Sequence, residues 1–92
     1  RAAHPREPFC ALAFKLHVGA HGALTFARIY SGTAEPGMQV LNPRTGRKER
    51  IQRILRMHAQ AGQQLERASA GDIVAFVGLK ATGSGDTLCD PG

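Results

Sequence analysis

The chain has 92 residues, the length of one small domain, which excludes two separate cores with an active-site cleft between them. Hydrophobic residues make up 42% and charged residues 21%, so the composition predicts a folded domain. Aromatic residues make up only 5% without any Trp, which argues against a platform for stacking bases. The longest apolar run, residues 73–79, is far shorter than the roughly 20 residues of a membrane-spanning helix, and no membrane span is predicted.

Residues 9–18 have the alternating pattern of a half-buried strand, with Lys15 and His17 among the odd positions and apolar side chains at the even ones. The even positions, which a half-buried strand turns toward the core, are Cys10, Leu12, Phe14, Leu16 and Val18. Gly19 and Gly22 flank a turn, and a second apolar run follows at 23–30. The two runs are predicted to form a β-hairpin.

Short apolar runs separated by Gly and Pro continue along the chain and predict an all-β protein. Further strands are expected at 31–35, at 38–41 and from Arg47, with a turn at 42–46. Residues 73–77 are apolar on both faces and rich in β-branched side chains, as in a central strand. Residues 87–89 are too few for more than an edge strand.

The segment 47–58 has two interpretations. Ile51, Ile54, Leu55 and His58 follow the spacing of one face of a helix, in a segment rich in helix-forming residues. A strand would place Ile51, Leu55 and Met57 on one face together with Glu49 and Arg53, which is a poorer alternation. The local pattern favours the helix and does not exclude the strand.

The positive charge is concentrated in residues 44–56, which contain six Arg or Lys residues and one acidic residue, Glu49. This segment carries a net charge of +5, which equals the formal net charge of the whole chain. Clustered cations attract phosphates and release their counterions, so we predict a site for a polyanion here, against the alternative of a solvated strand or helix face. The predicted phosphate contacts are Arg44, Arg47, Lys48, Arg50, Arg53 and Arg56.

No catalytic or metal site is predicted. His17 and His21 have weak spacing for a metal, and Cys10 or Cys89 with His58 is a poor candidate for nucleophilic catalysis because a buried free thiol is the commoner role. Residues 83–87 are rich in Gly, but no Gly-Lys-Ser/Thr follows and Asp86 would repel a phosphate, so a tight turn is expected.

The chain has 2 cysteines, which is sparse for a secreted domain that relies on disulfides. This number favours a reduced, intracellular setting and free thiols over a bridge between Cys10 and Cys89.

Seven short motifs together resemble domain II of bacterial and organellar elongation factor G, and the match runs from residue 8 to residue 90. They are FCALAFK at 9–15, LTFARIYSG at 24–32, KERI at 48–51, MHA at 57–59, AGDI at 70–73, GLK at 78–80 and GDTL at 85–88. The resemblance implies a closed, largely antiparallel Greek-key β-barrel of about six strands, in which 47–58 is one long, bent strand. Residues 1–8 would be a linker from a preceding GTPase domain, 9–90 the barrel, and 91–92 the start of the next linker.

The resemblance also implies the function. In this family the domain is not itself an enzyme; it packs on the GTPase domain of the same chain and contacts small-subunit ribosomal RNA during protein synthesis. GTP and magnesium would bind in the preceding domain, no cofactor in this one, and the protein would be cytoplasmic. We expect no membrane partner and a monomeric isolated domain. Asp72, Asp86 and Thr87 lie in motif turns, where we expect them to act as turn caps.

Two departures from the family pattern leave the subfamily open. Residues 62–65 read GQQL where two acids are usual, and residues 81–84 read ATGS where a Thr-rich string is usual. The same barrel occurs in ribosome-recycling and ribosome-protection GTPases, and the retained MHA motif favours the elongation factor. A freestanding RNA-binding barrel is a further alternative, for which exposed aromatic side chains would be expected.

Overall fold

The computed structural model describes residues 8–19, 22–58 and 61–91, and all regular structure in these ranges is β-strand. The strands are β1 (Cys10–Gly19), β2 (Gly22–Ser31), β3 (Thr33–Ala34), β4 (Gln39–Asn42), β5 (Arg47–Arg50), β6 (Arg53–His58), β7 (Ala61–Leu65), β8 (Ala68–Ser69), β9 (Ile73–Val77) and β10 (Thr87–Cys89). The all-β prediction is thus confirmed. The described ranges hold no helix long and apolar enough to cross a membrane. Most of the predicted N-terminal linker, residues 1–7, and Gly92 of the C-terminal one lie outside the described residues.

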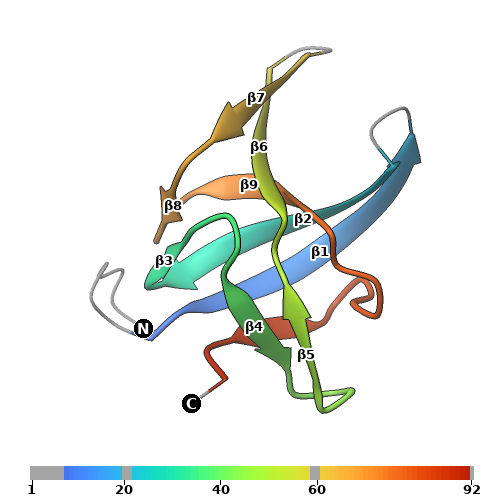
Figure 1. Cartoon of the computed structure of the whole chain (residues 1–92), viewed down its shortest axis with the longest axis vertical. Coiled ribbons are helices and arrows are strands. Elements are labelled where there is room, and N and C mark those ends of the chain that lie inside the picture. The colour runs from blue at the N-terminus through green and yellow to red at the C-terminus, as the bar shows by residue number, and fades with distance from the viewer. Residues whose placement is uncertain (1–7, 20–21, 59–60, 92) are drawn as a thin grey trace.

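Eight strands form one antiparallel sheet, in the order β5-β4-β10-β1-β2-β9-β6-β7, and β3 pairs with β8 in a small second sheet. The large sheet curls around the core as a half-barrel (Figure 1). Its order ends at β5 on one side and β7 on the other. The predicted barrel is therefore confirmed as an antiparallel curled sheet, but not as a closed one.

The segment 47–58 forms two strands rather than one bent strand or a helix. β5 pairs with β4, and β6 pairs with β9 and β7. Between them, the N–H of Ile51 donates to Met38 O at 2.9 Å, and the N–H of Gln52 donates to Val77 O at 2.8 Å. The chain therefore passes from one part of the sheet to another at this corner.

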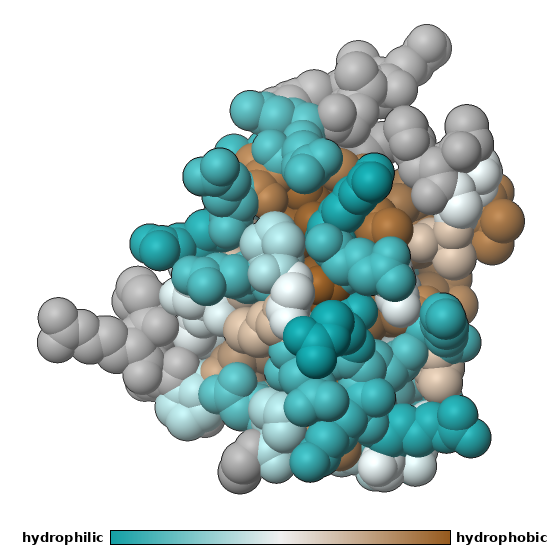
Figure 2. Space-filling model, in the orientation of Figure 1, coloured by the Kyte–Doolittle hydropathy of each residue, from teal (hydrophilic) through white to brown (hydrophobic). Residues whose placement is uncertain are grey.

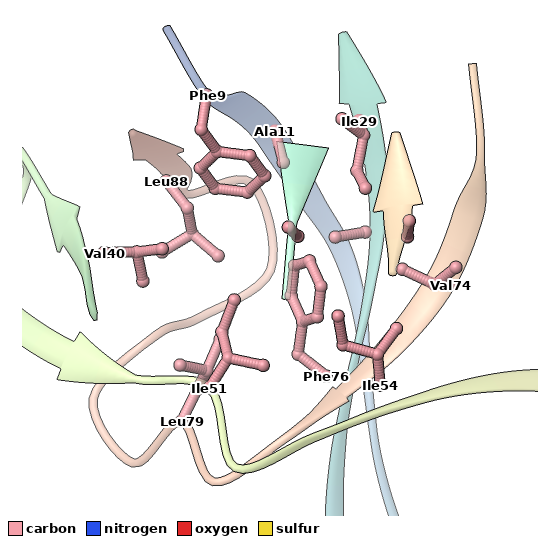
Figure 3. Packing of buried hydrophobic residues seen from close by; sticks show 13 residues of the cluster. Phe9, Ala11, Ile29, Val40, Ile51, Ile54, Val74, Phe76, Leu79 and Leu88 are labelled. Atoms are coloured by element: carbon pink, nitrogen blue, oxygen red, sulfur yellow. The ribbon is translucent and has the colours of Figure 1, made fainter. Parts of the chain in front are cut away.

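The core lies inside the curl and is formed by side chains from most of the strands. Figure 3 shows Phe9, Val40, Ile51, Ile54 and Phe76 pointing toward one another, and each is at most 2% exposed. The rings of Phe9 and Phe76 meet edge to face, with centroids 6.4 Å apart. Burying a large apolar side chain in this way stabilises a fold by roughly 1.5–3 kcal/mol.

The first strand buries the face opposite to the predicted one. Ala11 and Ala13 are fully buried, whereas Phe14 is 44% exposed and Val18 is 79% exposed. The small alanines fit where β1 lies between β2 and β10, and the pairing of β1 with β2 shifts register between Ala13 and Lys15, which disturbs the alternation. The apolar even positions of β1 therefore lie mainly on the outside of the sheet.

Two further expectations have different outcomes. The hairpin prediction is confirmed, because β1 and β2 pair antiparallel up to Gly19 opposite Gly22. The edge-strand prediction for residues 87–89 is wrong, because β10 lies between β4 and β1. The sequence does not reveal this placement, because the partners of β10 are distant in the chain. Leu88 pairs with Ala11, and Cys89 pairs with Leu41.

Candidate RNA-binding surface

The predicted basic site begins in the hairpin of β4 and β5, where Arg47 lies opposite Asn42 and Arg50 lies opposite Gln39. The connecting turn is built by Asn42, whose carbonyl oxygen accepts the N–H of Gly46 at 2.8 Å and whose side-chain oxygen accepts the N–H of Arg44 at 3.0 Å. Gly46 has a φ of 71°, a conformation that favours glycine. This turn orients the exposed residues Arg47, Lys48 and Arg50 on β5.

Asp86 fastens the turn to the loop that precedes β10. Its carboxylate accepts hydrogen bonds from Asn42 Nδ2 at 2.9 Å, from Arg44 Nε at 2.6 Å and Nη2 at 2.9 Å, and from the N–H of Gly83 at 2.7 Å. The Asp86 side chain is only 6% exposed. The hydrogen bonds from Arg44, Gly83 and Asn42 hold the pKa of Asp86 well below its usual range, although burial opposes the shift.

Glu49 makes a second connection between the hairpin and the same loop. Its Oε1 accepts the N–H groups of Lys80 at 2.5 Å and Ala81 at 3.0 Å, and its Oε2 accepts the hydroxyl of Thr82 at 2.7 Å. Burial alone would raise the pKa of Glu49, but these hydrogen bonds and the nearby charge of Arg47 outweigh it and lower the pKa. Both carboxylates therefore stay ionised at neutral pH and hold the loop beside β5.

Between β5 and this loop lies an open groove of about 330 Å³. Four cations line it, Arg47, Lys48, Arg50 and Lys80, together with Glu49, Gln52, Gly78 and Ala81. Figure 2 shows hydrophilic residues gathered over the lower part of this face, where Figure 1 places β4 and β5. Since Glu49 is the only acidic residue in this lining, the groove carries a net positive charge.

Gly78 keeps the groove open. Its φ is 111°, which side chains of L-residues rarely adopt, and a Cβ at this position would lie 2.6 Å from Gln52 Cγ and 3.1 Å from Arg50 O. Arg50 is in turn fixed by a hydrogen bond from its Nη1 to Gly37 O at 2.5 Å. The groove therefore depends on glycine at position 78.

The structure brings together three of the six predicted contacts, Arg47, Lys48 and Arg50. Arg44 lies on the same hairpin, but its guanidinium is engaged by Asp86 on two nitrogens. Arg53 lies beyond the corner, on β6, and Nη2 of Arg56 lies 3.5 Å from Asp72 Oδ1. Neither Arg53 nor Arg56 lines the groove.

Lys80 is the groove residue that the sequence analysis did not select. The charge count over 44–56 omitted it because it lies 24 positions beyond Arg56 in the sequence. Its motif, GLK at 78–80, was the available signal, since it follows the central strand directly. Only the folded chain shows that this loop returns to β5.

A second surface lies on the outer face of β1, β2 and β9. A shallow concavity of about 290 Å³ is lined by Leu12, Phe14, Arg28, Tyr30 and Ile73. Phe14, Tyr30 and Ile73 are 44%, 42% and 51% exposed. Exposed apolar side chains that lie together make this concavity a candidate interaction surface.

The remaining candidates of the sequence analysis do not form a site among the described residues. No three His, Cys, Asp or Glu side chains come together there as metal ligands. His21 and the MHA residue Ala59 lie outside the described residues. The turn-cap predictions for Asp72 and Asp86 are confirmed, because their Oδ2 atoms accept the N–H of Ser69 at 2.9 Å and of Gly83 at 2.7 Å.

Comparison with known proteins agrees with the motifs. The family model of elongation factor Tu domain 2 matches residues 22–89. Elongation factor G 2 of Trichodesmium erythraeum is 55% identical over 87 residues, which cover 95% of this chain and 12% of the relative. Elongation factor G 1 of Synechocystis sp. and elongation factor G 1 of Methylococcus capsulatus are each 54% identical over the same extent.

The curled antiparallel sheet and these matches define a β-domain of a translation factor. The chain belongs to the elongation factor Tu domain 2 family, and within it to the domain II type found in elongation factor G. This confirms the family that the seven motifs predicted. The chain spans 12% of the length of these relatives.

Proposed function

We propose that this chain is a domain of a GTPase that moves the ribosome along messenger RNA, and that it contacts small-subunit ribosomal RNA through the groove beside β5. The observation that carries this proposal is the convergence of Arg47, Lys48, Arg50 and Lys80 on one groove. The sequence identity of this chain to elongation factors G supports a role in translation.

The contact is to the RNA backbone rather than to bases. Arginine and lysine side chains bind phosphate oxygens, and cations on neighbouring positions of a strand and a loop can reach successive phosphates. The described part of the groove offers no aromatic side chain on which a base could stack. Binding therefore depends on RNA shape and on salt, with little dependence on sequence.

The test is binding to purified small ribosomal subunits across a salt series. The wild-type chain is expected to bind with a log–log salt slope of about −3 to −4, since about four phosphate contacts release their counterions. The triple variant Arg47→Glu, Lys48→Glu, Arg50→Glu should lose this binding, and Lys80→Glu should weaken it by itself.

The matched control changes the same net charge elsewhere. Lys15, Arg28 and Arg67 are exposed and lie outside the groove. If their joint change to Glu abolished binding as fully as the groove variant does, net charge rather than this groove would be responsible. Equal binding by the wild type and the groove variant would also refute the proposal.

We further infer that the apolar concavity of Leu12, Phe14, Tyr30 and Ile73 packs against the GTPase domain of the same protein. The chain spans only 12% of the length of its relatives, and a neighbouring domain is the partner that an apolar surface of this kind fits.

The double variant Phe14→Asp, Ile73→Asp should lose affinity for the separately produced GTPase domain. Val18→Asp is the control, because Val18 is 79% exposed but lies outside the concavity; equal affinity of both variants would refute this surface.

The other functional assignments follow from the same proposal. GTP and magnesium bind in the preceding domain, residues 1–8 and 91–92 connect the domain to its neighbours, and this domain contributes no catalytic group. The protein acts in the cytoplasm. The MHA motif favours a translocating factor over a ribosome-recycling or ribosome-protection GTPase, and a translocation assay with the longer protein distinguishes these three.

A further inference from the structure

The two cysteines lie directly opposite each other on neighbouring strands. In the pairing of β1 with β10, Cys10 faces Cys89, followed by Ala11 opposite Leu88 and Leu12 opposite Thr87. The N–H of Asp90 donates to Phe9 O at 3.2 Å, and the N–H of Ala13 donates to Asp86 O at 2.8 Å. These two bonds show that Phe9 with Asp90, and Ala13 with Asp86, are hydrogen-bonded pairs. Hydrogen-bonded and non-hydrogen-bonded pairs alternate along an antiparallel ladder. Cys10 and Cys89 lie next to Phe9 and Asp90, so they form a non-hydrogen-bonded pair.

This type of pair has the right dimensions for a disulfide. Opposite Cα atoms at non-hydrogen-bonded positions are about 4.5 Å apart, with the side chains on the same face and close together. A disulfide requires Cα atoms roughly 4.4–6.8 Å apart and Cβ atoms roughly 3.5–4.5 Å apart. No change of strand register is needed to join the two sulfur atoms.

Both thiols are partly accessible to a small reagent. Both cysteines are free and half-buried, and they lie on the face opposite to the buried Ala11 and Leu88. The thiol of Cys89 donates to Leu41 O at 3.6 Å. Burial is the main cause that raises the pKa of Cys89, so this thiol forms the attacking thiolate less readily than an ordinary cysteine at neutral pH.

We propose that Cys10 and Cys89 form a reversible cross-strand disulfide by exchange with a low-molecular-weight disulfide such as oxidised glutathione. One cysteine thiolate attacks the glutathione disulfide and forms a mixed disulfide, and the glutathione thiolate that leaves takes up the proton that the cysteine lost. The second cysteine then attacks the protein sulfur of the mixed disulfide and releases the other glutathione as a thiol. Two protein thiols are oxidised and one glutathione disulfide is reduced to two thiols.

The bond would fasten the strand that supports the proposed RNA-binding hairpin. β10 lies between β1 and β4, and β4 pairs with β5. The turn before β10 contains Asp86, which holds Arg44 and Asn42. Oxidation therefore ties this part of the sheet to β1 without altering a groove side chain, and the inference does not depend on RNA binding.

The test oxidises the fully reduced chain with oxidised glutathione and follows intact mass, free thiols and the melting temperature. Since the chain has 2 cysteines, a monomer that has lost two hydrogen atoms and all free thiols contains the Cys10–Cys89 bond. We expect this product at a rate independent of protein concentration, with a melting temperature raised on the order of 10 °C and restored by dithiothreitol.

A matched control moves one thiol along the same strand. The double variant Cys10→Ser, Leu12→Cys keeps two cysteines, but position 12 lies opposite Thr87 rather than Cys89. It should accumulate mixed disulfides with glutathione or disulfide-linked dimers. The proposal is overturned if the wild-type chain stops at mixed disulfides, forms only dimers, or closes the bridge no faster than this variant.

Discussion

The groove beside β5 and the outer face of β1, β2 and β9 are both exposed, but they are built in different ways. The groove side chains belong to a short hairpin and a loop that are held together by the carboxylates of Glu49 and Asp86. The apolar face belongs to longer strands, paired with one another over many residues. The charged surface therefore depends on a few ionised side chains, whereas the apolar surface depends on backbone pairing.

Within the charged part of the molecule, Asp86 and Asp72 make a second comparison. Each caps a turn by accepting the N–H of the residue three positions earlier, and each is close to an arginine. Asp86 is only 6% exposed and also binds Asn42, whereas Asp72 is 33% exposed and lies 3.5 Å from its arginine. The same local motif is therefore a surface cap in one place and a buried connection in the other.

Asp86→Ala should have the largest effect, because it leaves the buried Asn42 Nδ2, the partly buried N–H of Gly83 and the Arg44 guanidinium without their acceptor. We expect the melting temperature to fall on the order of 15 °C and binding to small ribosomal subunits to weaken as the hairpin loosens. Thermal unfolding and the salt-series binding assay measure both. Asp72→Ala is the control and should lower stability less and leave RNA binding unchanged; equal losses would show that burial does not distinguish the two caps.

Gly78→Ala should have the next largest effect on stability. The cause is backbone strain and crowding beside the groove, not a change of charge. A positive φ costs about 1 kcal/mol for alanine, and the contacts with Gln52 and Arg50 add to it, so we expect a loss of about 2–3 kcal/mol in urea unfolding. Gly37→Ala is the control, because Gly37 has a φ of 88° but a Cβ there would meet nothing within 4 Å. If both variants lost the same stability, the close approach at Gly78 would be unimportant.

Acid should loosen the hairpin before it affects the apolar face. The folded-state pKa values of Glu49 and Asp86 are lowered from ordinary values of 4.5 and 3.8, so their stabilisation is complete above those values and is lost as the pH falls below them. Urea unfolding between about pH 6 and about pH 3 should show stability falling with pH, and less steeply in Glu49→Gln and Asp86→Asn. Glu66→Gln, at an exposed position, should follow the wild type; a wild-type slope in all three variants would contradict this assignment.

The sequence predicted the parts of the fold that have a strong local pattern. Residues 73–77 are apolar on both faces, and β9 does lie between β2 and β6. The helical spacing in 47–58 arises because the corner at Ile51 and Gln52 shifts the strand alternation by one residue, so that Ile51 and Ile54 both face the core. Leu55 completes the apparent helical stripe by packing into a second cluster with Leu24 and Ala75. No local pattern reveals such a corner.

The site was predictable only where its signal is local in the sequence. Charge density along the chain is a local property, and it identified Arg47, Lys48 and Arg50. It could not identify Lys80, which reaches the groove through a loop, nor the engagement of Arg44 by Asp86, 42 residues apart. On β1, the strand itself was predicted correctly but its buried face was not, because tight packing against neighbouring strands selects Ala11 and Ala13.

The smallest effect is expected at the two predicted contacts that the fold places outside the groove. Arg53→Ala and Arg56→Ala should each leave binding to small ribosomal subunits within about twofold of the wild type, because neither lines the groove and Arg56 is next to Asp72. Arg47→Ala should weaken binding several-fold and reduce the salt slope by about one, as expected for one lost phosphate contact. If Arg53→Ala reduced the slope as much as Arg47→Ala does, the RNA would follow the basic segment past the corner onto β6, and the groove would be only part of the site.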